Sequence, residues 1–307
     1  MSTKQKRSSP IGSAKPLQKG EALKCPILIS YHYLRKWSPE HRTYVTSGQA
    51  NKDGFEIMLD SGAFSAKNSG AQIPLEEYMV FLHKNGYLFK GGYVALDVLG
   101  DVKGTEKNLE IMYDNGLKPM PVHVWGDNEK RMDYLFERAN KICFGGLRRP
   151  QRGSAPKEYV VQKMKWAKGR DVHWLGYTNK DYVTALLPHS VDSASFASAM
   201  IWGTMSMYLG SGMFKEFNMT KLPKVKFTYR MTKMLEEHGI VRNDLYKPET
   251  WRSSDAPTKQ ISTDSWVRYV CDLRRVWGVR HYLALSQYSS VCDILKYFKQ
   301  EKQRCSK

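Results

Sequence analysis

The chain has 307 residues, of which 41% are hydrophobic and 12% aromatic, so it can bury a sizeable core and is not disordered throughout. It has no run of about 18 uncharged apolar residues, and its N-terminus lacks the apolar stretch of a secretory signal. We therefore expect a cytoplasmic protein without a membrane anchor. Its five cysteines are widely spaced and form no C-x-x-C pair, which predicts neither a disulfide framework nor a zinc site.

The formal net charge of +18 is the unusual property of the composition, because 48 Lys and Arg outnumber 30 Asp and Glu. Residues 1–24 hold 6 basic and 1 acidic residue, residues 25–220 hold 24 and 20, and residues 221–307 hold 18 and 9. The two ends are therefore basic and the middle is nearly neutral. An excess of this size favours a polyanionic partner. We expect nucleic acid rather than an anionic membrane, with a merely solubilising surface as the alternative.

After a basic N-terminal segment, predicted strands and helices alternate along the chain. Residues 1–24 are rich in Lys, Ser, Gly and Pro and predict a disordered basic arm. From Cys25 onward, short continuous apolar runs predict buried parallel strands over residues 26–31, 55–60, 93–97, 119–124, 142–146, 172–176 and 189–192. Apolar residues at helical spacing predict helices between them, over residues 74–85, 105–115, 131–140 and 156–167.

This alternation of strands and helices predicts an α/β fold with a mostly parallel sheet. Seven strands favour a (β/α)₈ TIM-like barrel, with an eighth strand later in the chain, over a doubly wound sheet. No glycine-rich nucleotide-binding turn is present. We expect residues 25–220 to form the barrel core. The basic, mostly helical residues 221–307 would complete the barrel and contact nucleic acid.

Helices are also expected after the last of these strands. Met200, Trp202, Met205 and Tyr208 have the spacing of a helix core. Further along, the apolar stripe from Trp266 to Trp277 predicts a capped helix, and a last helix is expected over residues 291–302. The arginines outside the stripe are candidates for phosphate contacts, namely Arg268, Arg274 and Arg275.

Three carboxylates follow predicted strands, namely Asp60, Asp97 and Asp192. In barrel enzymes the carboxyl ends of the strands build the active site, so these side chains are expected to share one mouth. Two carboxylates facing one pocket suit the cleavage of a glycosidic bond, in which one stabilises or attacks the anomeric carbon and the other moves protons. A bound hard cation is the alternative use of three carboxylates.

Six short motifs carry a resemblance to a known family. They are DSGAF at residues 60–64, ALD at 95–97, PVHVWGD at 121–127, FGGL at 144–147, WLGYT at 174–178 and SVDS at 190–193. In order and spacing they resemble the tRNA-guanine transglycosylase superfamily, over about residues 26–200. The chain is most similar to the shorter phage and bacterial branch that exchanges guanine for a 7-deazaguanine in DNA. The resemblance implies a (β/α)₈ barrel and base exchange without an energy cofactor.

The resemblance also implies roles for single residues. Asp192 would be the nucleophile that attacks C1′ of a guanosine nucleotide, and Asp60 would be the acid and base that protonates the leaving base. Asp97 would accept hydrogen bonds from the guanine edge, Gly145 and Gly146 would bring backbone N–H groups to its O6, and other residues would enclose the ring. The expected substrate-binding residues are Ser61, Phe64, Asp97, His123, Trp125, Gly145, Gly146, Leu175 and Gly176.

The departures from the family narrow the expected substrate. The C-x-C-x-x-C zinc segment of the tRNA branch does not follow Asp192, so we expect DNA rather than tRNA and no cofactor. The loop after Gly146 carries arginines where bacterial tRNA enzymes have an acidic residue, which favours a base with a neutral substituent such as preQ0. Expected contacts of the opened strand are Arg148, Arg149, Arg152, Lys224, Lys226 and Arg230. The alternatives are a tRNA transglycosylase and a catalytically silent nucleic-acid-binding homologue.

Overall fold

A computed structural model of the chain describes residues 11–149, 153–154, 156–197, 203–252 and 256–305. It has an α/β fold around one curled, eight-stranded sheet in which every strand pair is parallel. The strand order is β3-β2-β1-β12-β9-β8-β5-β4. The strands are β1 (Cys25–Ser30), β2 (Phe55–Asp60), β3 (Gly92–Tyr93), β4 (Val122–His123), β5 (Lys141–Phe144), β8 (Asp171–Trp174), β9 (Ser190–Ser193) and β12 (Arg280–Leu285).

All seven predicted strands are confirmed, and β12 is the eighth. It enters the sheet between β1 and β9 although it lies near the C-terminus of the chain. The two strands at the ends of the order also meet. Val94 and Met120 form an isolated parallel bridge, with Met120 N donating to Tyr93 O (2.8 Å) and Ala95 N donating to Met120 O (3.0 Å).

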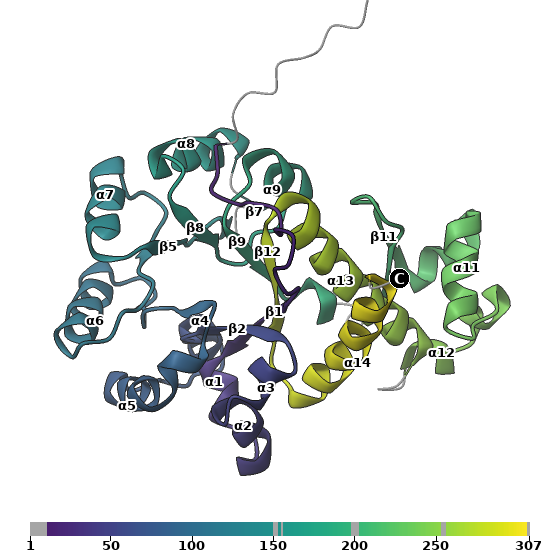
Figure 1. Cartoon of the computed structure of the whole chain (residues 1–307), viewed down its shortest axis with the longest axis horizontal. Coiled ribbons are helices and arrows are strands. Elements are labelled where there is room, and N and C mark those ends of the chain that lie inside the picture. The colour runs from purple at the N-terminus through teal and green to yellow at the C-terminus, as the bar shows by residue number, and fades with distance from the viewer. Residues whose placement is uncertain (1–10, 150–152, 155, 198–202, 253–255, 306–307) are drawn as a thin grey trace, which may run out of the picture.

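Helices cover the outside of the curled sheet, as Figure 1 shows. The predicted helices are confirmed with shifted ends, and each buries one apolar face. In α6, for example, Asp101 caps the first turn by accepting from Gly104 N (2.9 Å), and Leu109 and Met112 are buried. The covering helices are α1 (Tyr31–Leu34), α2 (Pro39–Thr46), α3 (Gln49–Lys52), α4 (Ala63–Asn68), α5 (Leu75–Asn85), α6 (Val102–Asp114), α7 (Glu129–Arg138), α8 (Lys157–Ala167), α9 (Lys180–Leu186), α13 (Pro257–Asp272) and α14 (Tyr288–Cys305). Among the described residues, no helix is both long and apolar enough to cross a membrane.

A lobe between β9 and β12 has a hydrophobic cluster of its own, and Figure 1 shows it beyond α13 and α14. The expected helix core there is wrong: Met205 and Tyr208 lie in a strand that pairs with the next one, so the alternating strand period applies. Met200 and Trp202 lie outside the described residues. The elements of the lobe are β10 (Thr204–Tyr208), β11 (Phe214–Asn218), η3 (Met219–Lys224), α11 (Tyr229–Glu237), η4 (Arg242–Tyr246) and α12 (Glu249–Arg252).

Residues 11–24 differ from the expected disordered arm, because they pack beneath the amino ends of β9 and β12. Ala14 is buried and its N–H donates to Leu187 O (3.2 Å). The Arg274 guanidinium donates to Lys15 O (2.8 Å) and pairs with Glu21 (2.7 Å). This end of the sheet is opposite the carboxyl ends of the strands, where the predicted site lies. Residues 1–10 lie outside the described residues.

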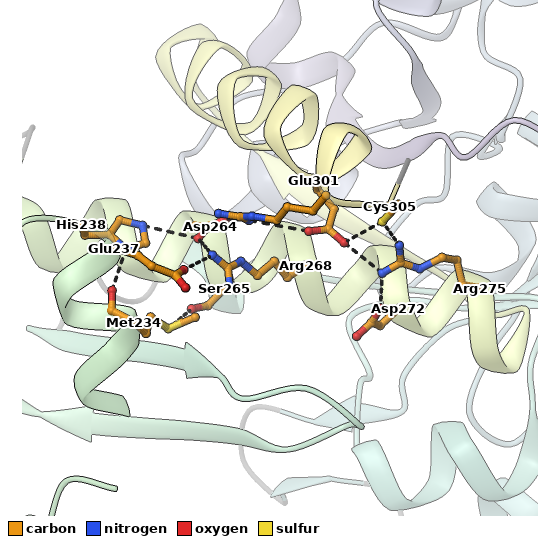
Figure 2. Close-up of polar contacts among 11 residues, drawn as sticks. Met234, Glu237, His238, Asp264, Ser265, Arg268, Asp272, Arg275, Glu301 and Cys305 are labelled. Atoms are coloured by element: carbon orange, nitrogen blue, oxygen red, sulfur yellow. Dashed lines mark hydrogen bonds and ion pairs between the residues drawn. The ribbon is translucent and has the colours of Figure 1, made fainter. Parts of the chain in front are cut away.

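The arginines expected to contact phosphates are instead paired with carboxylates of the protein. Figure 2 shows Arg268 and Arg275 where α11, α13 and α14 meet. Besides the pairing of Arg274, Arg275 pairs with Asp272 and with Glu301. Arg268 pairs with Asp264, a fully buried carboxylate that also contacts His238 (3.4 Å) and Arg304 (3.1 Å). These ion pairs, centred on the buried carboxylates of Asp264 and Glu301, join α11 of the lobe to α13 and α14.

Replacing Asp264 by Asn is therefore expected to lower the free energy of unfolding by about 3–5 kcal/mol, because Arg268 and Arg304 would lose their buried counter-charge. Asp244→Asn is the matched control. Asp244 pairs with Lys247 (2.6 Å) on the surface, and its loss should cost about 1 kcal/mol or less. Urea denaturation of both variants measures the difference. Equal losses would show that the pairs around Asp264 add nothing to the stability of this junction.

Candidate active site

Alternate residues of the strands point into the curled sheet, and these residues build the site. Met58, Cys143 and Tyr282 lie together in a small inner cluster, whereas their strand neighbours join the outer core beneath the helices. Because side chains alternate along a strand, Asp60, two residues after Met58, lies on the inner side of β2 at its carboxyl end. Asp192 faces inward from β9, since it meets the inner residue His173 of β8.

The Asp192 side chain is 12% exposed, and two donors hold its carboxylate. Gly176 N donates to Asp192 Oδ1 (2.8 Å), and His173 Nε2 lies 3.1 Å from the same oxygen. Gly176 has φ +61°, so its backbone takes a left-handed turn directly after β8 that aims this N–H at β9. Both donors therefore contact one oxygen of the carboxylate and fix its orientation.

Asp60 lies in a different environment. Burial in the mouth of the sheet, together with the nearby negative charges of Asp97 and Asp192, raises the pKa of Asp60 from 3.8 to about 7. The Gly62 N–H donates to Asp60 Oδ2 (2.9 Å), which opposes this shift without cancelling it. At neutral pH the Asp60 carboxyl is thus close to half protonated, as a proton donor and acceptor needs to be.

Asp97 completes the group of carboxylates. Ser61, buried directly after Asp60, donates from its hydroxyl to Asp97 Oδ1 at 3.5 Å, and burial raises the pKa of Asp97. The loop that carries Asp97 is tied to α6, because Thr105 Oγ1 accepts from Val98 N (2.8 Å) and Asn108 Nδ2 donates to Leu96 O (3.1 Å). The structure therefore brings the three predicted carboxylates to one mouth.

The three residues predicted to enclose the base follow the carboxyl ends of β2, β4 and β8. Phe64 on α4 is 58% exposed, and Trp125, 36% exposed, stacks on Tyr159 with 3.7 Å between ring centroids. Leu175 packs at the edge of the inner cluster. Exposed or half-exposed rings at a polar mouth can stack on a flat heterocycle without losing core packing.

The two glycines predicted to reach the base differ from each other. The Gly145 N–H donates to His123 O (3.0 Å), so it belongs to the sheet and is not available to a ligand, contrary to the prediction. Gly146 is exposed with φ +71°, and no backbone hydrogen bond of its N–H is found among the described residues. A Cβ at Gly146 would lie 3.1 Å from Trp125 Cβ, so a side chain there would press on Trp125.

His123 does not reach the mouth. Val122 and Val124, its neighbours in sequence, lie against the inner cluster, so His123 points outward, where Nε2 lies 3.0 Å from Asn128 O. Burial lowers its pKa to about 4. Its inclusion among the substrate-binding residues was wrong because a strand of two residues offers no alternation from which to read the inner face.

The predicted nucleic-acid contacts fall into two places. Arg148 and Arg149 form strand β6, which pairs with β7 (Gly153–Ser154) in a short hairpin just after the Gly146 turn, and Arg152 lies outside the described residues. Lys224, Lys226 and Arg230 are exposed on the lobe, where Arg230 Nη1 also donates to Leu209 O (3.1 Å). The described residues of this set therefore belong to two separate elements of the chain, the β6–β7 hairpin and the lobe.

Two residues of the site were not predicted. His173 is absent from the predicted set, although its position two residues before Leu175 places it on the same face of β8. Lys163 on α8 is fully buried and donates to His123 O (3.1 Å) and Val124 O (3.0 Å), which anchors the loop that carries Trp125. Burial lowers the pKa of Lys163 to about 7. No sequence pattern distinguishes this lysine from an exposed one.

A cavity of about 260 Å³ at the opposite, amino end of the strands is not part of this site. Four of the charged residues that line it form two ion pairs, Arg280 with Glu56 (3.0 Å) and Arg274 with Glu21 (2.7 Å). Among the described residues, no group of three or more His, Cys, Asp or Glu side chains is placed to hold a metal ion. No protein-family model matches the chain, and a search of curated proteins finds no match either.

Proposed function

We propose that the chain is a DNA guanine transglycosylase, which exchanges guanine for a free 7-deazaguanine base through a covalent Asp192 intermediate. One observation carries the proposal. Two carboxyl groups share the mouth of the sheet in different environments: Asp60 with a pKa raised to about 7, and Asp192 with one oxygen held by two N–H donors. Cleavage and re-formation of a glycosidic bond need this pair of a proton carrier and a nucleophile.

The same proposal treats the curled sheet as a (β/α)₈ barrel. The bridge between Val94 and Met120, which links the two end strands of the sheet, supports closure. So does the position of Asp60, Asp97 and Asp192, since catalytic residues of such barrels come from the carboxyl ends of several strands.

In the first half of the reaction, an oxygen of Asp192 forms a bond to C1′ of the target nucleotide while the bond from C1′ to N9 of guanine breaks. The electron pair goes to the base, and the Asp60 carboxyl donates the proton that neutralises it. In the second half, the incoming base gives its N9 proton to the Asp60 carboxylate and its nitrogen attacks C1′, which releases Asp192 as a carboxylate. Atoms and charges balance without a further cofactor.

The remaining residues would recognise the base. Asp97, supported by the Ser61 hydroxyl, accepts hydrogen bonds from the amino and N1–H groups of the guanine edge. Phe64, Trp125 and Leu175 enclose the ring, and the Gly146 N–H reaches O6. A neutral substituent at position 7 fits the arginine-containing loop after Gly146, because these cations would repel an aminomethyl cation.

DNA is the proposed macromolecular partner. The net charge of +18 supports a polyanion, and the exposed cations Lys224, Lys226 and Arg230 of the lobe would hold a strand whose target base has left the stack. The arginines of α13 and its C-terminal extension are used inside the protein, so the phosphate contacts are assigned to the lobe and to the loop after Gly146.

The purified protein, mixed with a radiolabelled preQ0-type nitrile base, is expected to transfer label into duplex DNA and not into bulk tRNA. The unlabelled nitrile base should compete better than its aminomethyl analogue. Acid-precipitable counts measure the transfer. Label in tRNA alone would show the alternative tRNA enzyme, and DNA binding without any transfer would show a silent homologue.

A further inference from the structure

We propose that His173 is the positioning residue that decides which oxygen of Asp192 attacks the sugar: together with the Gly176 N–H it holds Oδ1, and Oδ2 is the attacking atom. This inference rests on the proposed function and deepens it. It concerns a buried histidine that lies outside the six sequence motifs.

The contacts of His173 fix the orientation of its imidazole ring. Nε2 lies 3.1 Å from Asp192 Oδ1 and Nδ1 lies 2.9 Å from Ser190 Oγ, so both nitrogens are used by one neighbouring strand, β9. The ring is fully buried and packs edge-to-face with the Tyr282 ring, with 5.9 Å between the ring centroids and an interplanar angle of 78°. Ser190, His173 and Asp192 therefore form a fixed chain of contacts inside the sheet.

The direction of the hydrogen bonds follows from the chemistry of the groups. A carboxylate only accepts, so His173 Nε2 carries the proton and donates to Asp192 Oδ1. Nδ1 of the neutral ring then accepts from the Ser190 hydroxyl. Burial lowers the pKa of His173, which agrees with a neutral ring, although the Asp192 carboxylate opposes that shift.

Two donors on one oxygen make the two oxygens of Asp192 unequal. Gly176 N (2.8 Å) and His173 Nε2 both contact Oδ1, and no donor among the described residues contacts Oδ2. Attack through Oδ2 leaves both hydrogen bonds in place, since Oδ1 becomes the carbonyl oxygen of the glycosyl ester. Attack through Oδ1 would break them. The arrangement thus aims Oδ2 before substrate arrives, which is the kind of orientation that lowers a reaction barrier.

The test compares four full-length proteins in the DNA exchange assay: wild type, His173→Phe, His173→Gln and His281→Phe. Phenylalanine fills the site without a donor, whereas the Gln amide places an N–H close to the position of Nε2. His281 is the matched control, because it is also buried, lies on β12, the other neighbour of β9, and faces outward against Trp266 and Tyr269 of α13. Its Nε2 atom has no hydrogen-bond partner among the described residues.

We expect His173→Phe to lower kcat by about 100-fold with the KM for the free base unchanged, because orientation rather than base binding is lost. His173→Gln should recover most of that loss, and His281→Phe should keep the wild-type kcat. Thermal melts establish that each variant is folded. If His173→Phe does not fold, Ser190→Ala serves in its place, since it frees Nδ1 and should lower kcat without changing KM.

The inference is overturned if folded His173→Phe keeps the wild-type kcat, or if His173→Gln is no better than His173→Phe at equal stability. A parallel rise in KM for the base would assign His173 to base binding instead and would also overturn it. These outcomes differ from failure of the proposed function, in which the wild-type protein itself transfers no label and the inference falls with it.

Discussion

Asp192→Asn is expected to abolish the covalent intermediate and to lower the exchange rate by about 10⁴-fold or more, since catalysis would lose its nucleophile. The Asn carbonyl can still accept from the Gly176 N–H and from His173, so the site should keep its shape. Free-base binding should therefore survive. Single-turnover experiments with labelled DNA, followed by denaturing gels, measure the adduct directly.

Asp171→Asn is the control for this experiment. Asp171 begins β8 at the opposite end of the sheet, where it pairs with His189 (2.9 Å), so its loss should leave the adduct unchanged. Normal adduct formation by Asp192→Asn would exclude Asp192 as the nucleophile. Loss of base binding together with the adduct would show that the carboxylate shapes the pocket rather than reacting.

Asp60→Asn is expected to lower the exchange rate by about 10²–10⁴-fold, because the leaving base loses its proton donor. In the wild-type protein we expect the rate of adduct formation to depend on pH through the protonation of Asp60. Since its pKa is about 7, the rate of adduct formation should fall tenfold per pH unit above pH 7, as the protonated fraction falls. Single-turnover rates between pH 6 and pH 9 test this, and a flat profile would exclude Asp60 as the acid.

Asp60→Asn should also make the fold more stable at high pH. The folded-state pKa of about 7 exceeds the ordinary value of 3.8, so the folded protein holds this proton more tightly than the unfolded chain does. The stabilisation from this proton is complete below about pH 4 and is lost as the pH rises through 7. Three pKa units correspond to at most about 4 kcal/mol, and about 1–3 kcal/mol is expected because Asp60 is partly exposed.

Urea denaturation of wild type and Asp60→Asn at pH 3.5 and pH 8 separates the effect of the Asp60 charge on stability from any effect of the substitution on packing. The two proteins should be equally stable at pH 3.5, and the variant should be the more stable at pH 8. Equal differences at both pH values would mean that Asp60 is an ordinary carboxylate in the folded protein.

Much of the fold follows from local patterns. The seven early strands could be predicted because continuous apolar runs fit no exposed element. The eighth strand was expected later in the chain but was not placed, because Arg280 and His281 shorten the apolar run of β12. Residues 204–208 were assigned to a helix because their apolar spacing fits either period, and only pairing with β11 decides between them.

Site residues near the carboxyl end of a predicted strand could be identified from the sequence. Residues whose role depends on contacts between neighbouring strands could not. Asp60 and Asp192 follow apolar runs of β2 and β9, so their place at the carboxyl end could be read from the sequence. The role of His173 depends on β8 lying beside β9, which sequence spacing does not state. His123 and Gly145 were assigned to the pocket because the inward face of β4 and the hydrogen bonds of β5 cannot be read from so few residues.

The end strands β3 and β4, which meet at one bridge, are paired far less extensively than β1 and β2. Each end strand has two residues, whereas β1 and β2 pair over six residues. Segments with few backbone hydrogen bonds open at the lowest cost. Asp97 and Trp125, which would select the base, follow the two end strands, while Asp60 and Asp192 lie on β2 and β9. In the proposed reaction, the residues that select the base would therefore follow the least extensively paired strands, and the two reacting carboxylates would lie on other strands of the sheet.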